Sequence, residues 1–317
     1  MQQNIKKEFT LVFYSSLFIF FSTLLLIKLS SEFFILFCLF PLFIIALSTD
    51  IKITFLSYCL ALVLLIIFFI SAGNFIESES LKYLYINLTL IFFLAFLFST
   101  LLKINNNQFS LGIVVSYYNL ALSLLLSFFL FFFYFDANIN FNIEEIKKTY
   151  FDQMKILNPD LKLQIDSLIN FIFKIVPALN SIFFLVLTIL NFFLAQKLLK
   201  KLQLDINNEI TFNHLEIPNW YFYSQIVLIL IFMISNGNIN LFALNTLLLF
   251  SSIFIINGFF SLLSFLKIKK INILIKFLLL FLLFIFFSYL LIIFLFILGI
   301  NRKIKQISND FQIRGKK

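Results

Sequence analysis

The sequence predicts an all-α protein, a polytopic transmembrane bundle of eight or nine membrane segments. Two observations carry this prediction. The chain is 62% hydrophobic and only 12% charged, whereas about a quarter of the residues of a typical soluble protein are charged. Its apolar residues also gather in long runs, and about 20 helical residues are enough to cross the hydrocarbon core of a bilayer. We therefore expect residues 1–317 to form a single integral membrane domain.

Nine apolar runs qualify by length as membrane segments. The second and seventh are short, and each is followed by a polar turn, STDIK at 48–52 and SNGNIN at 235–240. These turns predict two helical hairpins, although either short segment could instead be re-entrant. The nine runs are Leu11–Ile27, Phe33–Leu47, Ile53–Ile70, Leu84–Leu102, Leu111–Phe135, Leu168–Leu194, Trp220–Ile234, Leu241–Leu266 and Ile271–Leu298.

The first run resembles a signal peptide, because Lys6 and Lys7 precede it. The residues after it, KLSSEFF, contain no clear small-x-small cleavage site, so we expect a retained first segment. The net charge of +9 comes from Lys and Arg between apolar runs, which is the usual pattern at membrane boundaries. We expect an inner-membrane location, contact with the lipid bilayer and no nucleic-acid partner.

Basic loops normally lie in the cytoplasm, and this rule conflicts with nine crossings. With a cytoplasmic N-terminus, the clusters at 197–201 and 267–270 lie inside, but the basic tail that begins at Arg302 lies outside. Either the tail breaks the rule or the last run turns back within the membrane.

The longest loop, residues 136–166, predicts an amphipathic extramembrane connector between the fifth and sixth segments. Apolar residues recur there at helical spacing, with Glu and Lys between them. We favour a connector that lies on the membrane surface over a lid that covers a cavity. The apolar positions are Ile143, Ile146, Tyr150, Met154 and Leu157.

Polar residues within membrane segments usually face other helices or a cavity, because exposure to hydrocarbon is costly. They form stripes on the fifth, sixth and eighth segments, which predict either a solute site or helix-packing seams. Lys174 lies inside a segment, where its ammonium would either point into the polar cavity or extend outward to the headgroups. The candidate solute-lining residues are Asn170, Lys174, Ser181, Asn119 and Asn257.

The sequence carries no pattern that identifies a reaction. It has no phosphate-binding loop and no H-E-x-x-H motif, and it contains a single histidine. Cys38 and Cys59 lie in apolar runs without a Cys or His partner nearby in sequence. The apolar segments have no Asp or Glu in their interiors, which disfavours a proton pump. We expect no catalytic residues, no metal site, no cofactor and no enzymatic activity.

The passage FNHLEIPNWYFYSQ at 212–225 contains the only histidine and the only tryptophan. Proline suits the first turn of a helix, so Pro218 is expected to start the seventh segment. Trp220 and Tyr221 would then lie at headgroup depth, and the passage would act as an interfacial anchor. The alternative is a functional role for His214, as a ligand or a proton carrier.

From NFFLAQKLLKKLQL at 191–204 to LGINRKIKQ at 298–306, the chain resembles the YybS-like family of predicted bacterial membrane proteins. The resemblance implies a membrane protein similar to the substrate-binding membrane subunits of vitamin uptake systems, which hold a small molecule between helices without chemistry. It does not imply a particular substrate. The matching positions are Asn191, Ala195, Lys200, Pro218, Trp220, Asn245, Gly258 and Arg302.

The leading hypothesis is thus a multi-pass inner-membrane protein that binds or helps to transport a small-molecule solute. The alternative is a non-transporting membrane scaffold or assembly factor with a membrane protein partner, in which the polar stripes are packing seams. A polar cavity would favour the first hypothesis, and tightly packed stripes would favour the second.

Overall fold

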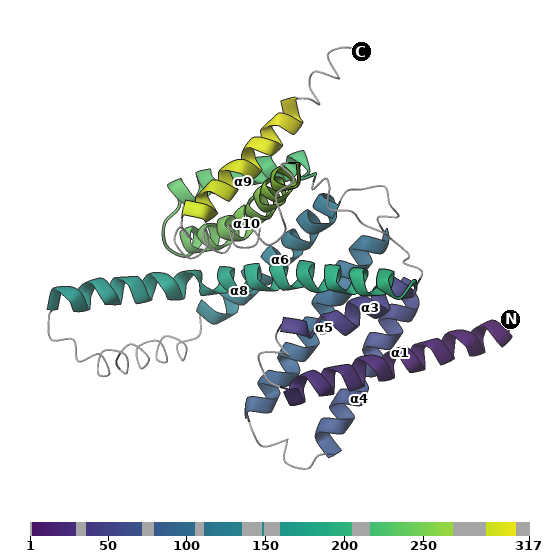
Figure 1. The fold of residues 1–317 in the computed structure, drawn as a ribbon. Helices are drawn as coiled ribbons and strands as arrows, with labels where there is room; N and C mark the ends of the chain where they lie inside the picture. Colours follow the sequence, from purple (N-terminus) through teal and green to yellow (C-terminus); the bar gives the residue numbers. More distant parts are fainter. Residues whose placement is uncertain are drawn as a thin grey trace. The chain divides into compact units, whose positions relative to one another are not determined.

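The computed structural model describes residues 2–29, 36–71, 79–104, 111–134, 148, 159–204, 216–268 and 290–308. Within these ranges the regular secondary structure is helical, without strands (Figure 1). The predicted all-α class is therefore confirmed. Most of the connector at 136–166, together with His214, lies outside the described residues.

The helices overlap the apolar runs, and several of them extend beyond their runs. Their bounds are α1 (Gln2–Leu29), α3 (Phe40–Ser48), α4 (Ile51–Ser71), α5 (Glu79–Ile104), α6 (Leu111–Tyr134), α8 (Pro159–Lys201), α9 (Asn219–Ile234) and α10 (Gly237–Ile268). A further helix covers residues 290–308 and is called the C-terminal helix below.

Five helical stretches in the described part are long and apolar enough to cross a membrane. Thr89–Ile104 and Asn219–Ile234 are apolar but shorter. Helix α3 has nine residues, about 13 Å at 1.5 Å per residue, so this helix alone cannot cross the bilayer as the second predicted run would. The five long stretches are Lys7–Lys28, Ile51–Phe68, Leu111–Phe128, Ile165–Lys201 and Gly237–Phe265.

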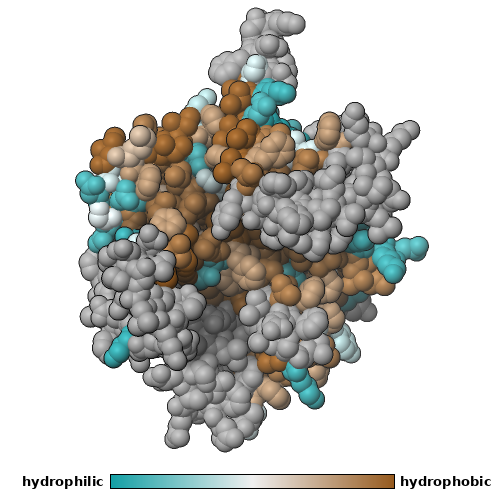
Figure 2. Space-filling model, turned by 60° about the vertical axis from the view of Figure 1, so that its left-hand side comes forward, coloured by the Kyte–Doolittle hydropathy of each residue, from teal (hydrophilic) through white to brown (hydrophobic). Residues whose placement is uncertain are grey.

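Large apolar side chains remain on the surface of these helices. Phe9, Met233 and Ile234 are 71%, 75% and 80% exposed, and hydrophobic residues cover much of the coloured surface in Figure 2. Apolar patches of this extent are rare on soluble monomers, whereas hydrocarbon chains can cover them without cost. The surface therefore agrees with a helical membrane protein.

The chain divides into two compact units, and each is described here by itself. Unit 1 contains Met1–Val114 and Phe184–Thr211, and unit 2 contains Val115–Phe183 and Phe212–Lys317. Helix α8 thus contributes its last part to unit 1 and its first part to unit 2.

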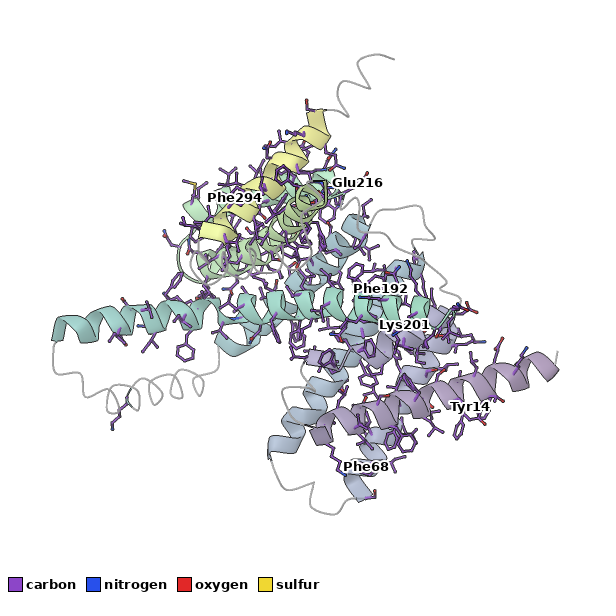
Figure 3. All side chains as sticks on the ribbon, in the orientation of Figure 1. Tyr14, Phe68, Phe192, Lys201, Glu216 and Phe294 are labelled. Carbon is purple, nitrogen blue, oxygen red and sulfur yellow. The ribbon has the colours of Figure 1, made fainter. Side chains whose placement is uncertain are left out.

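The core of unit 1 is built around three phenylalanines from α3, α5 and α8. Phe43, Phe98 and Phe192 are fully buried, and their ring centroids lie 5.6 to 6.0 Å apart in edge-to-face pairs (Phe192 is labelled in Figure 3). This geometry adds favourable ring contacts to the burial of apolar area.

A lysine stabilises the turn between α3 and α4 in the same unit. The ammonium of Lys103, at the end of α5, donates to the carbonyl of Thr49 and, at 2.8 Å, to the hydroxyl of Thr54. Thr49 directly follows α3, and the C-terminal end of a helix attracts a cation.

In unit 2, α9 and α10 form the predicted hairpin around the turn at 235–236. Gly237 begins α10 with a φ of 63°, a conformation that favours glycine. The amide of Asn240 donates to the carbonyls of Phe232 at 2.7 Å and Ser235 at 3.1 Å. These bonds satisfy carbonyls at the end of α9 that have no partner within the helix.

The C-terminal helix packs against α10 through two glycines. A Cβ built on Gly258 would lie 1.9 Å from the carbonyl oxygen of Leu295, and one built on Gly299 would lie 1.9 Å from that of Phe254. Because each glycine faces the backbone of the other helix, the two helices run antiparallel and approach more closely than any other residue would allow.

Candidate functional site

The polar stripes of α6 and α10 face the interior of unit 2. Ser116, Asn119 and Ser123 on α6 are buried, and so are Thr246 and Asn257 on α10. The burial of these five residues agrees with the cost of placing polar groups against hydrocarbon, whereas Ser264, on the same predicted stripe of α10, is exposed.

The most connected of these residues is Asn119. Its amide nitrogen donates to the carbonyl of Leu249 at 2.9 Å and to the hydroxyl of Tyr221 at 2.6 Å. The hydroxyl of Tyr221 in turn donates to the carbonyl of Phe250 at 3.1 Å, and the two rings stack with centroids 4.5 Å apart. One amide thus ties α6 to both helices of the hairpin.

A second amide, that of Gln225, lies on α9 one helical turn after Tyr221. The nitrogen of Gln225 donates to the hydroxyl of Ser251 at 2.6 Å, and Ser251 donates to the carbonyl of Leu247 at 2.7 Å. Because residues four apart share a helix face, Tyr221 and Gln225 point toward the same side. We call the side chains of Asn119, Tyr221, Gln225 and Ser251 the polar centre.

The partners of the two amides determine which atom of each is the oxygen. The carbonyl of Leu249 can only accept, so the Asn119 atom that faces it must be the nitrogen. The hydroxyl of Ser251 already donates its proton to Leu247, so Gln225 must present its nitrogen to it. The amide oxygens are therefore the atoms that point elsewhere.

Both amide oxygens are buried and accept no hydrogen bond from the described residues. The same holds for the hydroxyl of Thr246, which lies one turn before Leu249 and Phe250 on α10. Leaving a buried polar atom unpaired costs about 1–3 kcal/mol. A water molecule or a solute with N–H or O–H groups would remove this cost.

The polar centre contains only uncharged polar side chains. It combines two amides, a phenol and a hydroxyl, without a carboxylate or an imidazole to act as a base. Within the described ranges, no three His, Cys, Asp or Glu side chains are grouped as metal ligands.

The structure does not bring the five predicted site residues together. The Asn170 amide donates to Asp166 on its own helix at 3.0 Å, and the Ser181 hydroxyl donates to the carbonyl of Pro177 at 3.0 Å. The side chain of Lys174 is exposed. Asn257 lies on α10, 3.5 Å from the carbonyl of Gly299. Asn119 alone among the five belongs to the polar centre.

The predicted anchor is only partly at the protein surface. Pro218 precedes the first residue of α9 instead of lying in its first turn. Trp220 is half-buried, with its ring 5.4 Å from that of Tyr117. Tyr221, however, is fully buried, so its hydroxyl meets Asn119 and not the headgroups. The spacing of Tyr221 and Gln225 was the signal in the sequence, because two polar groups four residues apart mark an interior helix face.

The start of the predicted basic tail is a packed part of unit 2. Residues 302–308 continue the C-terminal helix, and Lys303 is only 2% exposed. Its ammonium donates to the carbonyl of Ile217, just before α9, and approaches Gln306 at 3.4 Å. Lys303, at the start of the basic tail, is therefore a buried part of unit 2.

This contact predicts that the C-terminal tail and the passage before α9 leave the membrane on the same side. Glu216 and Lys305 are both exposed (Glu216 is labelled in Figure 3). In a background with Cys38 and Cys59 replaced, we expect Glu216→Cys and Lys305→Cys to react with an impermeant thiol reagent from the same side. Labelling from opposite sides would contradict the prediction.

A family model described as predicted membrane protein (DUF2232) matches residues 15–301 of the chain. None of the curated proteins and none of the solved structures matches it.

Proposed function

Since the chain belongs to the family of predicted membrane proteins DUF2232, we propose that it is a multi-pass inner-membrane protein that binds a small solute and helps to transport it. We place the solute at the polar centre of unit 2. The observation that supports this proposal is the pair of buried amide oxygens, on Asn119 and Gln225, that accept no hydrogen bond from the described residues.

These atoms favour one class of solute. Amide oxygens only accept hydrogen bonds, so the solute must donate N–H or O–H groups. No charged side chain belongs to the polar centre, and an unpaired buried charge would be costly. A neutral solute with donor groups, such as an amide or a polyol, therefore fits better than an anion.

The YybS-like resemblance supports the same proposal. It implies a protein that holds a small molecule between helices without chemistry, and the uncharged side chains of the polar centre join α6, α9 and α10. The solute proposed here nevertheless meets Asn119 and Gln225, and not Lys174 as the sequence had predicted.

The test compares solute retained by the wild-type protein and by variants. Asn119→Leu together with Gln225→Leu removes both acceptor oxygens and roughly preserves side-chain volume. At about 1 kcal/mol for each hydrogen bond, we expect retention to fall about tenfold or more. The measurement is mass spectrometry of small molecules released by denaturing protein purified in lipid nanodiscs.

Lys174→Met is the matched control, because Lys174 is exposed and makes no contact with the polar centre. It should retain solute like the wild type. The proposal fails if the wild-type protein releases no stoichiometric solute, or if the double variant releases as much as the control.

The second candidate is a non-transporting scaffold or assembly factor. The close contact of α10 with the C-terminal helix at Gly258 and Gly299 favours it, because small residues at a helix interface serve close packing. For this candidate, the same purification should recover a stoichiometric membrane protein partner and no solute.

A further inference from the structure

Helix α8 contains a proline, Pro177, in its interior. Proline has no N–H to donate to the carbonyl four residues earlier, and its ring crowds that carbonyl. Helices therefore usually bend or open at an internal proline, unless another group satisfies the backbone atoms that are freed.

A side chain from α10 reaches this turn. The Asn245 oxygen accepts a hydrogen bond from the backbone N–H of Ala178 at 3.0 Å, and its nitrogen donates to the backbone carbonyl of Lys174 at 2.8 Å. In a regular α-helix, the N–H of residue 178 and the carbonyl of residue 174 pair with each other. The amide of Asn245 thus binds both members of one backbone pair, directly beside the proline.

The contact of Asn245 with α8 is buried, and the orientation of its amide is fixed. Asn245 and Ala178 are fully buried, and Ala178 packs with Leu126 and Leu130 of α6. The nitrogen of Asn245 also donates to Leu241 on its own helix at 2.9 Å, so the amide is held in one orientation.

We propose that Asn245 is a latch that bridges the backbone of α8 beside Pro177. The amide donates to the Lys174 carbonyl and accepts from the Ala178 N–H, the backbone pair next to the one that Pro177 cannot form, and it fixes the first part of α8 to α10. Release of the amide leaves the Ala178 N–H and the Lys174 carbonyl without this bridge, and it lets the helix bend further at Pro177. The latch is independent of any solute, because neither of its contacts involves the polar centre.

The test is a double-mutant cycle between Asn245→Ala and Pro177→Ala. The readout is hydrogen exchange at the amide of Ala178, followed by mass spectrometry of the full-length protein in nanodiscs. In the wild-type background, Asn245→Ala should speed this exchange about tenfold, the factor that corresponds to about 1.4 kcal/mol. With Pro177→Ala, the helix can pair its own backbone, so Asn245→Ala should change the exchange little.

Asn240→Ala is the matched control. Asn240 lies on the same helix and also donates to backbone carbonyls, but at the end of α9. Its loss should leave exchange at Ala178 unchanged in both backgrounds. If Asn245→Ala alone does not accumulate, recovery of folded protein by the added Pro177→Ala supports the latch, and no recovery overturns it. An equal effect of Asn245→Ala in both backgrounds also overturns it.

Discussion

Replacing Gly258 by alanine is expected to destabilise the protein, although alanine normally favours a helix over glycine by about 0.5–1 kcal/mol. The reason is the contact with the C-terminal helix. The new Cβ would lie 1.9 Å from the oxygen and 2.7 Å from the carbon of the Leu295 carbonyl. Backbone cannot rotate away as a side chain can, so the two helices must separate, and overpacking typically costs about 1–3 kcal/mol.

This prediction can be distinguished from an effect of helix propensity, because propensity alone would make Gly258→Ala stabilising. Ser264 is an exposed residue of the same helix, so Ser264→Ala should leave the midpoint of thermal unfolding nearly unchanged. Gly299→Ala should match Gly258→Ala, because its Cβ meets Phe254 in the same way. The double variant should cost less than the sum, since the first substitution already separates the helices. A Gly258→Ala protein that unfolds at a higher temperature would contradict the contact.

The sequence predicted the helices well, because the length of an apolar run and the hydrogen bonds of its own backbone are both local properties of the chain. A segment in hydrocarbon must satisfy its own backbone hydrogen bonds, so an apolar run of sufficient length becomes a helix. The hairpin turns were equally visible, as polar residues between two apolar runs. The burial of Asn119 also followed from one helix, because its stripe contains Ser116 and Ser123 at helical spacing.

The site could not be predicted in the same way, because its contacts join helices that are distant in sequence. Asn119 bonds to Tyr221, and Asn245 bonds to the turn beside Pro177. Periodicity tells which face of a helix is buried but not which helix covers it. Asn170 has the right phase for an interior position, yet Asp166 on its own helix satisfies it.

Lys303 illustrates the same limit for charged residues. A lysine at the end of an apolar run predicts a solvated tail, because most lysines at such positions extend into water. Here the carbonyl of Ile217, which precedes α9, accepts a hydrogen bond from the ammonium. No pattern within either segment indicates this pairing.

Tyr221→Ala is expected to have the largest effect of any single substitution in the polar centre. Tyr221 is fully buried, stacks on Phe250 and bonds to both Asn119 and the Phe250 carbonyl. Truncating a buried aromatic side chain costs about 3–5 kcal/mol. The substitution also leaves Asn119 with one hydrogen-bond acceptor fewer in a buried position.

Two further substitutions serve as comparisons. One distinguishes the contribution of the Tyr221 ring from that of its hydroxyl, and the other tests the half-buried neighbour Trp220. Tyr221→Phe keeps the ring and removes the hydroxyl, so it should cost only about 1–2 kcal/mol. Trp220→Phe changes a half-buried neighbour and should leave folding intact. The fluorescence of the single tryptophan reports thermal unfolding of the Tyr221 variants, and light scattering reports that of Trp220→Phe. If Trp220→Phe proved more damaging than Tyr221→Ala, the aromatic passage would be anchored through Trp220, and Tyr221 would not be the residue that joins α9 to α6.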